Sequence, residues 1–468
     1  MQLRGSRVVL ALSLACGLGA LSAPFAFAGA KGHGHEKTVV RIGALVDQTG
    51  PSTSPLFKSA VELAAAQMNE ALEKRHSRLE IEVVFGDTKG TVPATAQAEA
   101  LRLINEEGVQ ALVSDSSGDT VAVNKLNYDP ASLAIQKVPV TCFQCSSGFI
   151  NNPATVEVDP LTQAAERDVD NWLYRVFYNA NYEAAVQVQM ALQQANGGDR
   201  NGDGLLKIAI FADAGHKSLA TAIAPTLPSF YTGPSSIEIT YMTTLADIPA
   251  QWPLVVDGLN GTTPDGEPDI IILAMLPGNV ATAVQAYRQG GYTLPLQSNN
   301  SLRRNYLLAQ LGALAEGIQG SSVAAVNTGW SGELFTDAFV DATGQQPELT
   351  SSGAYDATMT LMLATVAASG DVLRPMAVTP AGIRTALGRI NNPHGLKIRP
   401  SVLHLEWAAF LMGFGLPINY DGAYNADDWN AVGDIFPPLV HWKVEGGQFV
   451  ETQQFQCDPA HPLCVEIQ

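Results

Sequence analysis

The stretch Val39–Val46 (VVRIGALV) decides the class of fold, because it is a short apolar run rich in β-branched residues. Such a run predicts a strand that is buried on both faces, as in a parallel sheet. Gln48–Pro51 (QTGP) interrupts the run, and apolar residues at helical spacing follow over residues 59–72. Leu79–Phe85 (LEIEVVF) then predicts a second strand. The order strand, helix, strand is typical of a parallel sheet covered by helices.

The same alternation continues along the chain and starts again after residue 180. The first part adds a predicted helix over 91–107 and strands over 110–113 and 138–140. The second part predicts strands over 207–211, 236–241, 269–274, 294–297 and 321–326 and helices over 183–194, 218–227 and 279–289. Helices over 332–343, 352–368 and 379–390 and a hairpin over 439–450 follow. We therefore predict an α/β protein with two doubly wound parallel-sheet lobes.

The composition allows a large core and makes nucleic acid an improbable partner. The chain has 468 residues, of which 46% are hydrophobic and only 15% charged. It can therefore bury a large hydrophobic core, and its composition is not that of a disordered chain. Its 45 acidic residues outnumber 27 basic ones, for a net charge of -18. A chain of this charge repels phosphate backbones, so we expect no nucleic-acid partner.

The N-terminus has the order of a secretory signal peptide. Arg4 and Arg7 precede an apolar run that extends from Val8 to Ala28 and ends in small residues. We predict a signal peptide over 1–28, a polar linker over 29–37 and a mature protein in the periplasm. Two alternatives stay open, namely an uncleaved membrane anchor and a lipid anchor on Cys16. No other stretch of the sequence is long and apolar enough to span a membrane.

Four cysteines remain after cleavage, and their even number in an exported chain favours disulfides. The local pairings are Cys142 with Cys145 and Cys457 with Cys464, although the sequence also allows two other connectivities. A zinc site from the two pairs is the alternative, but no histidine stands nearby at ligand spacing. The C-x-x-C pair also fits a thiol oxidoreductase, whose companion pattern is lacking, so a disulfide that stiffens the loop is favoured.

Several segments, in this order, resemble the periplasmic leucine/isoleucine/valine-binding family, the type I periplasmic binding proteins. They are Arg41–Val46 (RIGALV), Trp172–Phe177 (WLYRVF), Pro268–Ile272 (PDIII), Ala286–Tyr292 (AYRQGGY), Leu314–Gly320 (LAEGIQG), Tyr355–Ala357 (YDA) and Ile418–Gly422 (INYDG). Each motif alone is weak, whereas their order and spacing are specific. The resemblance covers roughly residues 38–450.

The resemblance implies two lobes that are joined by three crossovers and close on a ligand by a hinge motion. Mapped onto this sequence, lobe 1 holds 38–177 and 328–415, and lobe 2 holds 178–327 and 416–468. It also implies a monomer that delivers its solute to an ABC transporter permease and contacts the membrane only through that permease.

In that family, hydroxyls and backbone N–H groups on two lobe 1 loops hold a ligand carboxylate. The matching positions here are Ser116 and Ser117 in one loop and Gln144, Ser146 and Ser147 in the other. Short hydroxyls and amides at a helix N-terminus suit an anion. The alternative is that these serines only cap helices.

Lobe 2 departs from the family, which puts an amino-acid ligand in doubt. His216 stands where a tyrosine that faces the ligand is common, and the loop with Asn299 and Asn300 lacks the acid that often holds an ammonium group. Asn181 and Met275 complete the candidate ligand contacts. An amino acid, an amide or a small carboxylate remains open as the ligand.

Residues 199–204 (DRNGDG) match the first half of a calcium loop. Asp199, Asn201 and Asp203 would be the ligands, but the twelfth position is Ile210 rather than glutamate. We therefore expect no cofactor apart from an optional structural calcium ion. The alternative is an Asx-rich turn before a strand.

Three function classes follow from these observations. The first is a binding protein that hands its solute to an ABC permease, with the ATPase on another chain because no G-x-x-x-x-G-K motif is present. The second is a ligand sensor that signals to a membrane receptor. The third is a secreted enzyme, for which neither G-x-S-x-G nor H-E-x-x-H is found, so no catalytic residue is assigned.

Overall fold

The computed structural model describes residues 37–49, 54–90, 92–129, 136–147, 150, 157–158, 165–166, 168, 170–256, 267–324, 326–327, 329–425, 429–430, 432–458 and 461–467. The predicted signal peptide, Cys16 and the linker before Lys37 lie outside these residues. None of the described helices is both long and apolar enough to cross a membrane.

Lobe 1 is built on a parallel sheet of five strands. In sheet order the strands are β2 (Leu79–Asp87), β1 (Thr38–Val46), β3 (Ala111–Ser116), β4 (Val140–Gln144) and β7 (Leu173–Arg175). Along β1, Val40, Ile42 and Ala44 point into one core cluster and Leu45 into another. This alternation buries both faces of the sheet, as the apolar run predicted.

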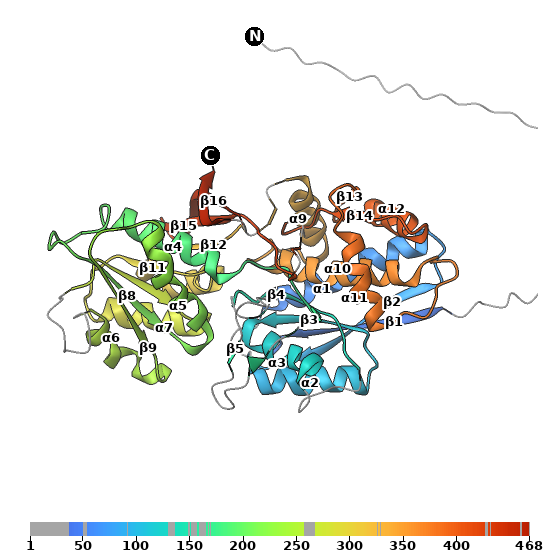
Figure 1. Ribbon diagram of the computed structural model, residues 1–468, viewed down its shortest axis with the longest axis horizontal. Helices are drawn as coiled ribbons and strands as arrows, with labels where there is room; N and C mark the ends of the chain where they lie inside the picture. The colour runs from blue at the N-terminus through green and yellow to red at the C-terminus, as the bar shows by residue number, and fades with distance from the viewer. Residues whose placement is uncertain are drawn as a thin grey trace, which may run out of the picture. The chain divides into compact units, whose positions relative to one another are not determined.

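Helices cover both faces of this sheet (Figure 1). One face packs against α1 (Pro55–Lys74) and α10 (Ser351–Ser369), and the other against α2 (Pro93–Asn105) and α3 (Ser117–Tyr128). The remaining elements of this lobe are α9 (Trp330–Thr343), α11 (Pro380–Ile390), α12 (Val402–Gly413), β13 (Leu396–Ile398) and β14 (Ile418–Tyr420), while β5 (Glu157–Val158) and β6 (Ala165–Glu166) pair separately. Ser54 caps α1 and Pro55 opens it, so this helix begins earlier than its apolar spacing predicted.

Lobe 2 is built on a mixed sheet of eight strands. In sheet order they are β17 (His461–Ile467), β16 (Gln448–Asp458), β15 (Leu439–Glu445), β12 (Gln319–Val323), β11 (Leu296–Ser298), β10 (Ile270–Ala274), β8 (Leu206–Ala212) and β9 (Ser235–Tyr241). The last five are parallel, and the C-terminal three extend the sheet as antiparallel strands. The predicted hairpin over 439–450 is therefore longer and carries a third strand.

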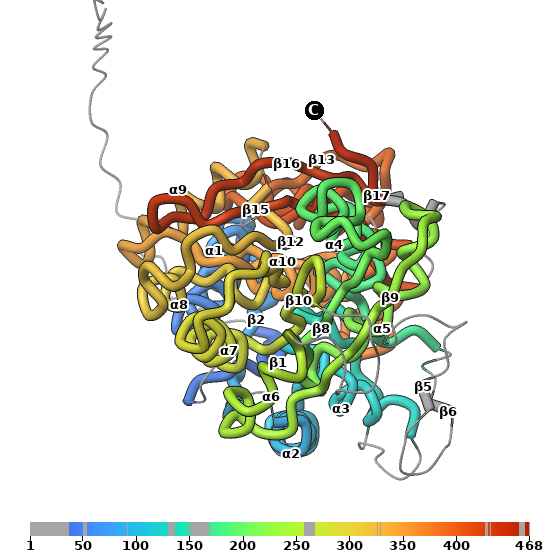
Figure 2. The backbone as a smooth tube through the Cα atoms, turned by 90° about the vertical axis from the view of Figure 1, so that its left-hand side faces the viewer, coloured from blue at the N-terminus to red at the C-terminus, as the bar shows by residue number. Residues whose placement is uncertain are grey.

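Helices also lie on both faces of the lobe 2 sheet. One face packs against α4 (Ala180–Gln194) and α5 (Lys217–Thr226), and the other against α6 (Ile248–Val256), α7 (Pro277–Gln289) and α8 (Asn305–Leu311). Short 3-10 turns are η1 (Ala214–His216), η2 (Leu227–Ser229), η3 (Leu245–Asp247) and η4 (Gly312–Ala315). Helix α4 also contacts β17, which Figure 2 shows near it at the C-terminal end of the chain.

The chain passes between the two sheets three times, from β7 to α4, from β12 to α9 and from β14 to β15, as the described elements show. The predicted boundary between residues 415 and 416 is too early. Strand β14 pairs with β13 and contacts α11 and α12 of lobe 1, because Ile418 and Tyr420 are buried in the core there. We propose that the third passage begins after Tyr424.

Both local cysteine pairings are formed as disulfides, Cys142 with Cys145 and Cys457 with Cys464. The first lies in the buried end of β4 and the second joins β16 to β17. Zinc ligation by these sulfurs is therefore wrong. The first pair is fully buried, which agrees with a role in stiffening the loop.

Candidate functional site

A cavity of about 370 Å³ lies where strand ends of the two sheets face each other. In a doubly wound sheet, ligands bind at the carboxyl ends of the strands. Lobe 1 contributes residues at and directly after the ends of β3 and β4, and lobe 2 contributes residues that follow β8, β10 and β11. The lining residues are Ser54, Phe57, Pro93, Asp115, Ser116, Ser117, Gly118, Gln144, Ser146, Ala214, Gly215, His216, Leu276, Pro277, Asn300, Ser301, Arg304, Tyr306 and Glu348.

The lobe 1 wall is the N-terminus of α3. The sequence placed residues 114–120 in a loop, but β3 continues to Ser116 and α3 starts at Ser117. The Ser116 hydroxyl oxygen accepts the N–H of Asp119 at 3.3 Å and so caps the helix, while the Ser117 hydroxyl oxygen accepts the N–H of Ser147 at 3.1 Å. Each hydroxyl keeps its own proton to donate, so capping and anion binding are compatible.

Asp115 stands beside these serines with its side chain almost fully buried. Burial, together with the neighbouring carboxylates Asp119 and Asp47, raises the pKa of Asp115 to about 8 despite the opposing effect of Arg304. At neutral pH the carboxyl group is therefore mostly protonated. It can donate a hydrogen bond and does not repel an anion in the cavity.

The lobe 2 wall presents His216 in a fixed orientation. Its Nδ1 lies 3.2 Å from the Oδ1 of Asp213, and its Nε2 lies 3.3 Å from the Oγ of Ser301. Asp213 is itself buried and accepts hydrogen bonds from the Leu276 N–H and the Asn279 side chain, at 2.5 and 2.7 Å. The imidazole is thus held by a second layer of polar contacts, as in many binding sites.

Arg304 brings a positive charge from lobe 2 into the cavity. Its guanidinium donates to the carbonyl of Leu349 at 2.8 Å, to the hydroxyl of Thr350 at 3.4 Å and to the Oε1 of Gln144 at 3.0 Å, and these three residues all belong to lobe 1. Burial lowers the pKa of Arg304 from its usual value, but an arginine stays charged at any physiological pH. Arg304 therefore links the lobes and faces the ligand space at the same time.

The rest of the lining gives the cavity an apolar side. Phe57 lies under the Arg304 guanidinium at 5.8 Å, and Tyr306, Leu276 and Pro277 add further apolar surface. Glu348 is an acidic member of the lining and accepts a hydrogen bond from Ser54 at 2.7 Å. A ligand that combines a charged group with an apolar body matches these surfaces.

The cavity brings together six predicted contacts, namely Ser116, Ser117, Gln144, Ser146, His216 and Asn300. Four other candidates do not line it. Met275 is fully buried in the core of lobe 2, and Asn181 lies on the exposed first turn of α4. Asn299 is buried and its Oδ1 accepts the Ser301 N–H, while Ser147 donates its N–H to the Ser117 hydroxyl and accepts the Arg175 guanidinium at its carbonyl.

Sequence reasoning assigned no role to Asp115, Arg304, Tyr306 and Glu348, which all line the cavity. The pair Arg303-Arg304 was visible after the asparagine loop, but nothing in the sequence says which arginine faces the cavity. Arg303 instead donates to Ser322 and Val323 and pairs with Glu451. Asp115, Tyr306 and Glu348 come from separate segments of the chain, and only the folded protein brings them to one cavity.

Comparisons with known proteins agree with this architecture. Residues 39–207 match the model of the family described as periplasmic binding protein. The fold is that of a periplasmic binding protein. This confirms the resemblance and the fold class that the sequence predicted.

Solved structures of periplasmic binding proteins superpose over most of the chain. A solute-binding protein of an ABC transporter from R. palustris, in complex with 4-hydroxybenzoate, has a TM-score of 0.63 at 17% identity and covers 90% of this chain and 98% of its own. The branched-chain amino acid transporter substrate-binding protein LivJ from Streptococcus pneumoniae, in complex with isoleucine, has a TM-score of 0.61 at 14% identity, with coverage of 92% and 100%. A leucine-binding protein from Thermotoga maritima has a TM-score of 0.60 at 17% identity, with coverage of 89% and 98%. No curated protein matches the sequence.

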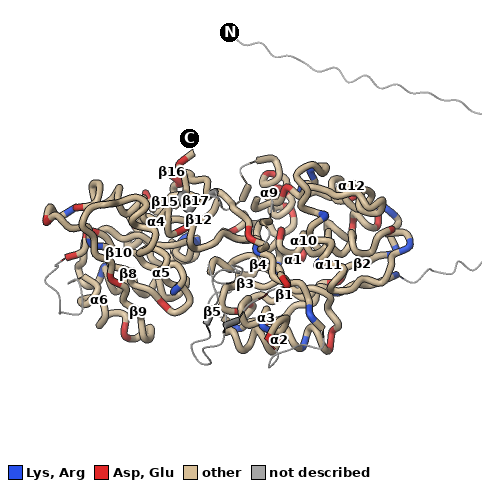
Figure 3. Tube along the Cα trace, viewed as in Figure 1, with Lys and Arg blue, Asp and Glu red and all other residues tan. Residues whose placement is uncertain are grey.

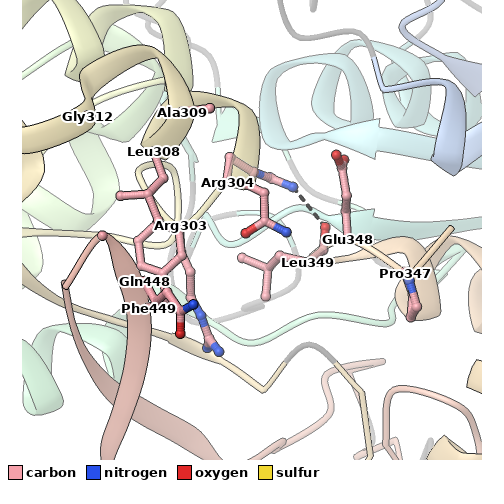
Figure 4. Close-up of a pocket in the computed structure, with 12 residues that line it drawn as sticks. Arg303, Arg304, Leu308, Ala309, Gly312, Pro347, Glu348, Leu349, Gln448 and Phe449 are labelled. Atoms are coloured by element: carbon pink, nitrogen blue, oxygen red, sulfur yellow. Dashed lines mark hydrogen bonds between the residues drawn. The ribbon is translucent and has the colours of Figure 1, made fainter. Parts of the chain in front are cut away.

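A second cavity of about 700 Å³ adjoins the first at Arg304 and Glu348 (Figure 4). It lies between α8, the turn from β15 to β16 and the residues that precede α10. Figure 4 shows Arg304 turned toward the Leu349 carbonyl and Arg303 turned toward Gln448 and Phe449. The strand ends of both sheets and the N-terminus of α3 line the smaller cavity, so it is the site that a periplasmic binding protein fold favours.

The predicted calcium loop has the geometry of an Asx turn. The Asp199 carboxylate accepts the N–H groups of Gly202, Asp203 and Gly204, and the Asp203 carboxylate pairs with Lys207. Among the described residues, no group of three or more His, Cys, Asp or Glu side chains is placed to hold a metal ion.

We expect calcium at millimolar concentration to leave the melting temperature unchanged, because the oxygens that would bind it already accept amides or an ammonium group. Thermal unfolding with calcium and with EDTA measures this. A higher melting temperature in calcium would instead support a truncated calcium loop.

Proposed function

We propose that this protein captures a small organic carboxylate in the 370 Å³ cavity outside the cytoplasm and delivers it to an ABC permease. The observation that carries the proposal is the pairing of Arg304 from lobe 2 with the α3 N-terminus of lobe 1 around one cavity. An anion between them contacts donors of both lobes, so its binding favours the closed arrangement.

The neighbouring groups support an anion over the other solutes that the sequence leaves open. Asp115 is mostly neutral at pH 7, and the imidazole of His216 lines the same cavity. The apolar surface of Phe57 and Tyr306 suits an organic body attached to the carboxylate. Glu348 offers a carboxylate to an ammonium group, so amino acids belong in any ligand screen.

Thermal unfolding of the exported protein against carboxylates, amino acids and amides tests capture. A ligand that binds the native state raises the melting temperature by mass action. We expect rises with benzoate-sized and branched aliphatic carboxylates and none with the matching amides. Rises with amides alone would contradict the proposed solute class.

Uptake of the captured solute in radioactive form tests delivery. Cells that carry the gene should take up the solute, and cells that lack the gene but keep the permease should not. Undiminished uptake in the deletion strain would overturn delivery and leave a ligand sensor as the remaining function of the same site.

The affinity for a carboxylate should fall as the pH rises through about 8, the pKa of Asp115. Below this pH the Asp115 carboxyl group is protonated and neutral, whereas above it a negative charge stands beside the bound anion. Calorimetric titration between pH 7 and 9.5 measures the change. In Asp115→Asn the group cannot ionise, so the affinity should stay flat, and an equal fall in the variant would rule out Asp115 as the cause.

A further inference from the structure

Helix α12 carries large apolar residues on two opposite faces, yet only one of these faces is covered. Leu405, Ala408, Ala409 and Met412 are buried against lobe 1, where the helix contacts α1 and α10. A helix at the surface of a protein normally has one apolar face, which packs against the core. The opposite side of α12 therefore requires a separate explanation.

That opposite side carries an exposed apolar stripe. Leu403 is 62% exposed, Trp407 51% and Phe414 70%, and the half-buried Phe410 completes the row. The Phe410 ring centroid lies 6.0 Å from that of Trp407 and 4.9 Å from that of Phe414. Steps of four, three and four residues place the row along one narrow line of the helix, which is the spacing of a seam between two packed helices.

The exposed surface continues past the end of the helix. Leu416 is 50% exposed, and these five residues, Leu403, Trp407, Phe410, Phe414 and Leu416, are here named the α12 patch. A large side chain of this kind buries ~150–250 Å² when it is fully covered. Multiplied by the exposed fractions of the five residues, this gives the α12 patch an exposed area on the order of 500 Å². The largest apolar patch on a typical monomer covers about 300–600 Å² and is often functional, so the α12 patch has the size of an interaction surface.

Two residues at the margin bring the apolar surface close to the area that a stable dimer needs. Trp330 is 56% exposed and its ring lies 5.7 Å from that of His404 on α12, and Leu396 of the adjoining β13 is 54% exposed. With them the surface approaches the roughly 800 Å² that each partner contributes to an interface of standard size.

The charges around the α12 patch have both signs, which suits a copy of the same surface. Arg75 lies over the Phe410 ring at 4.8 Å, and Lys74 lies 3.7 Å from Glu406 and 2.8 Å from Glu70. Figure 3 shows residues of both charges around this helix. In a two-fold arrangement, basic residues of one copy can face acidic residues of the other. An anionic membrane surface would instead favour a predominantly basic border, whereas this border is mixed and the chain has a net charge of -18.

We propose that two copies of this chain associate through the α12 patch around a two-fold axis. None of the residues that line the ligand cavity belongs to α12, β13 or the α12 patch, so the proposed interface uses no residue of the cavity. The family resemblance implied a monomer, and the proposed dimer is the alternative to that expectation.

Sedimentation equilibrium of the full chain, purified after export, tests the proposal between 0.1 and 50 µM, a range of about 500-fold that brackets a micromolar dimer. We expect twice the mass of one chain at the upper end. In Trp407→Glu/Phe414→Glu the dissociation constant should rise at least about 100-fold, since two central apolar anchors become charged. The matched control is Leu254→Glu, which changes a leucine that is 42% exposed on α6 of lobe 2 and should leave the dimer intact.

Thermal unfolding and ligand affinity show whether the variant stays folded, and both should be unchanged because the substituted side chains are exposed. A mass of one chain at every concentration overturns the proposal. So does a dimer that persists in the double variant. Sedimentation of the monomeric protein with vesicles of phosphatidylglycerol, lost in the double variant, would overturn it in favour of a lipid partner.

Discussion

Arg304→Met is expected to weaken ligand binding at least about 100-fold, the largest effect at the cavity. Three of the guanidinium's five donors are used in described contacts to Leu349, Thr350 and Gln144, which leaves two N–H groups for a ligand in the cavity that Arg304 lines. Hydrogen bonds to a charged group contribute ~1.5–3 kcal/mol each, and about 1.4 kcal/mol is tenfold in affinity. The variant also removes the contacts that link the lobes, so closure around the ligand becomes less favourable.

Calorimetric titration with the carboxylate that raises the melting temperature most measures this loss. Arg303→Met is the matched control, because Arg303 is the neighbouring residue and does not line the ligand cavity. Arg304→Lys keeps the positive charge but lacks the forked donors of the guanidinium. Its affinity for the carboxylate should therefore lie between that of the wild type and that of Arg304→Met. If Arg304→Met binds as tightly as Arg303→Met, the carboxylate does not contact Arg304.

Arg175→Met is expected to lower the free energy of unfolding by about 3–5 kcal/mol, the usual result of breaking a buried ion pair from one side. Arg175 is fully buried, and its guanidinium donates to Asp434 at 2.9 Å and to the carbonyls of Cys145 and Ser147 at 2.7 and 2.8 Å. It therefore joins the end of β7 to the disulfide loop beside the cavity and to the segment before β15. Without it, the Asp434 charge stays buried and two carbonyls lose their donor.

Urea unfolding followed by tryptophan fluorescence measures the change in stability. Arg41→Met serves as the control, because Arg41 pairs with Glu82 on the surface, where both side chains are nearly half exposed. Such exposed pairs contribute about 0–1 kcal/mol. Asp434→Asn added to Arg175→Met should recover part of the loss, since it removes the unpaired charge. Equal stability of Arg175→Met and Arg41→Met would contradict the role given to this network.

The large sequence separation between Arg175 and its partner Asp434 shows why sequence motifs reveal less than the structure. The segment Trp172–Phe177 was one of the segments that resemble the family, and β7 and the first passage between the lobes lie there. Its arginine bonds to Asp434, which is 259 positions away along the chain. No local pattern pairs two residues at that separation, so the network was found only in the folded protein.

Local sequence patterns were sufficient to predict most helices and strands, but they did not predict a helix whose start depends on a capping residue. The β-branched run at Val39–Val46 predicted β1 because a buried strand needs apolar residues on both faces. The stretch from Ser114 to Thr120 has no apolar periodicity, and α3 was missed there. Its start depends on the cap from Ser116 and on packing against β3 and β4, which propensity alone does not report.

The sequence by itself determined the strand and helix alternation, and hence the two doubly wound lobes, because burial on both sheet faces leaves an apolar pattern in each element. The resemblance to the binding-protein family also pointed to Ser116, Ser117, Gln144, Ser146, His216 and Asn300, because they stand at positions that hold the ligand in that family. Only the tertiary structure decided that Arg304 rather than Arg303 enters the cavity and that Asp115 is mostly neutral there. The direction of a side chain and its desolvation depend on elements that are distant in sequence but pack around the residue. A pattern of neighbouring residues in the sequence does not show which elements these are.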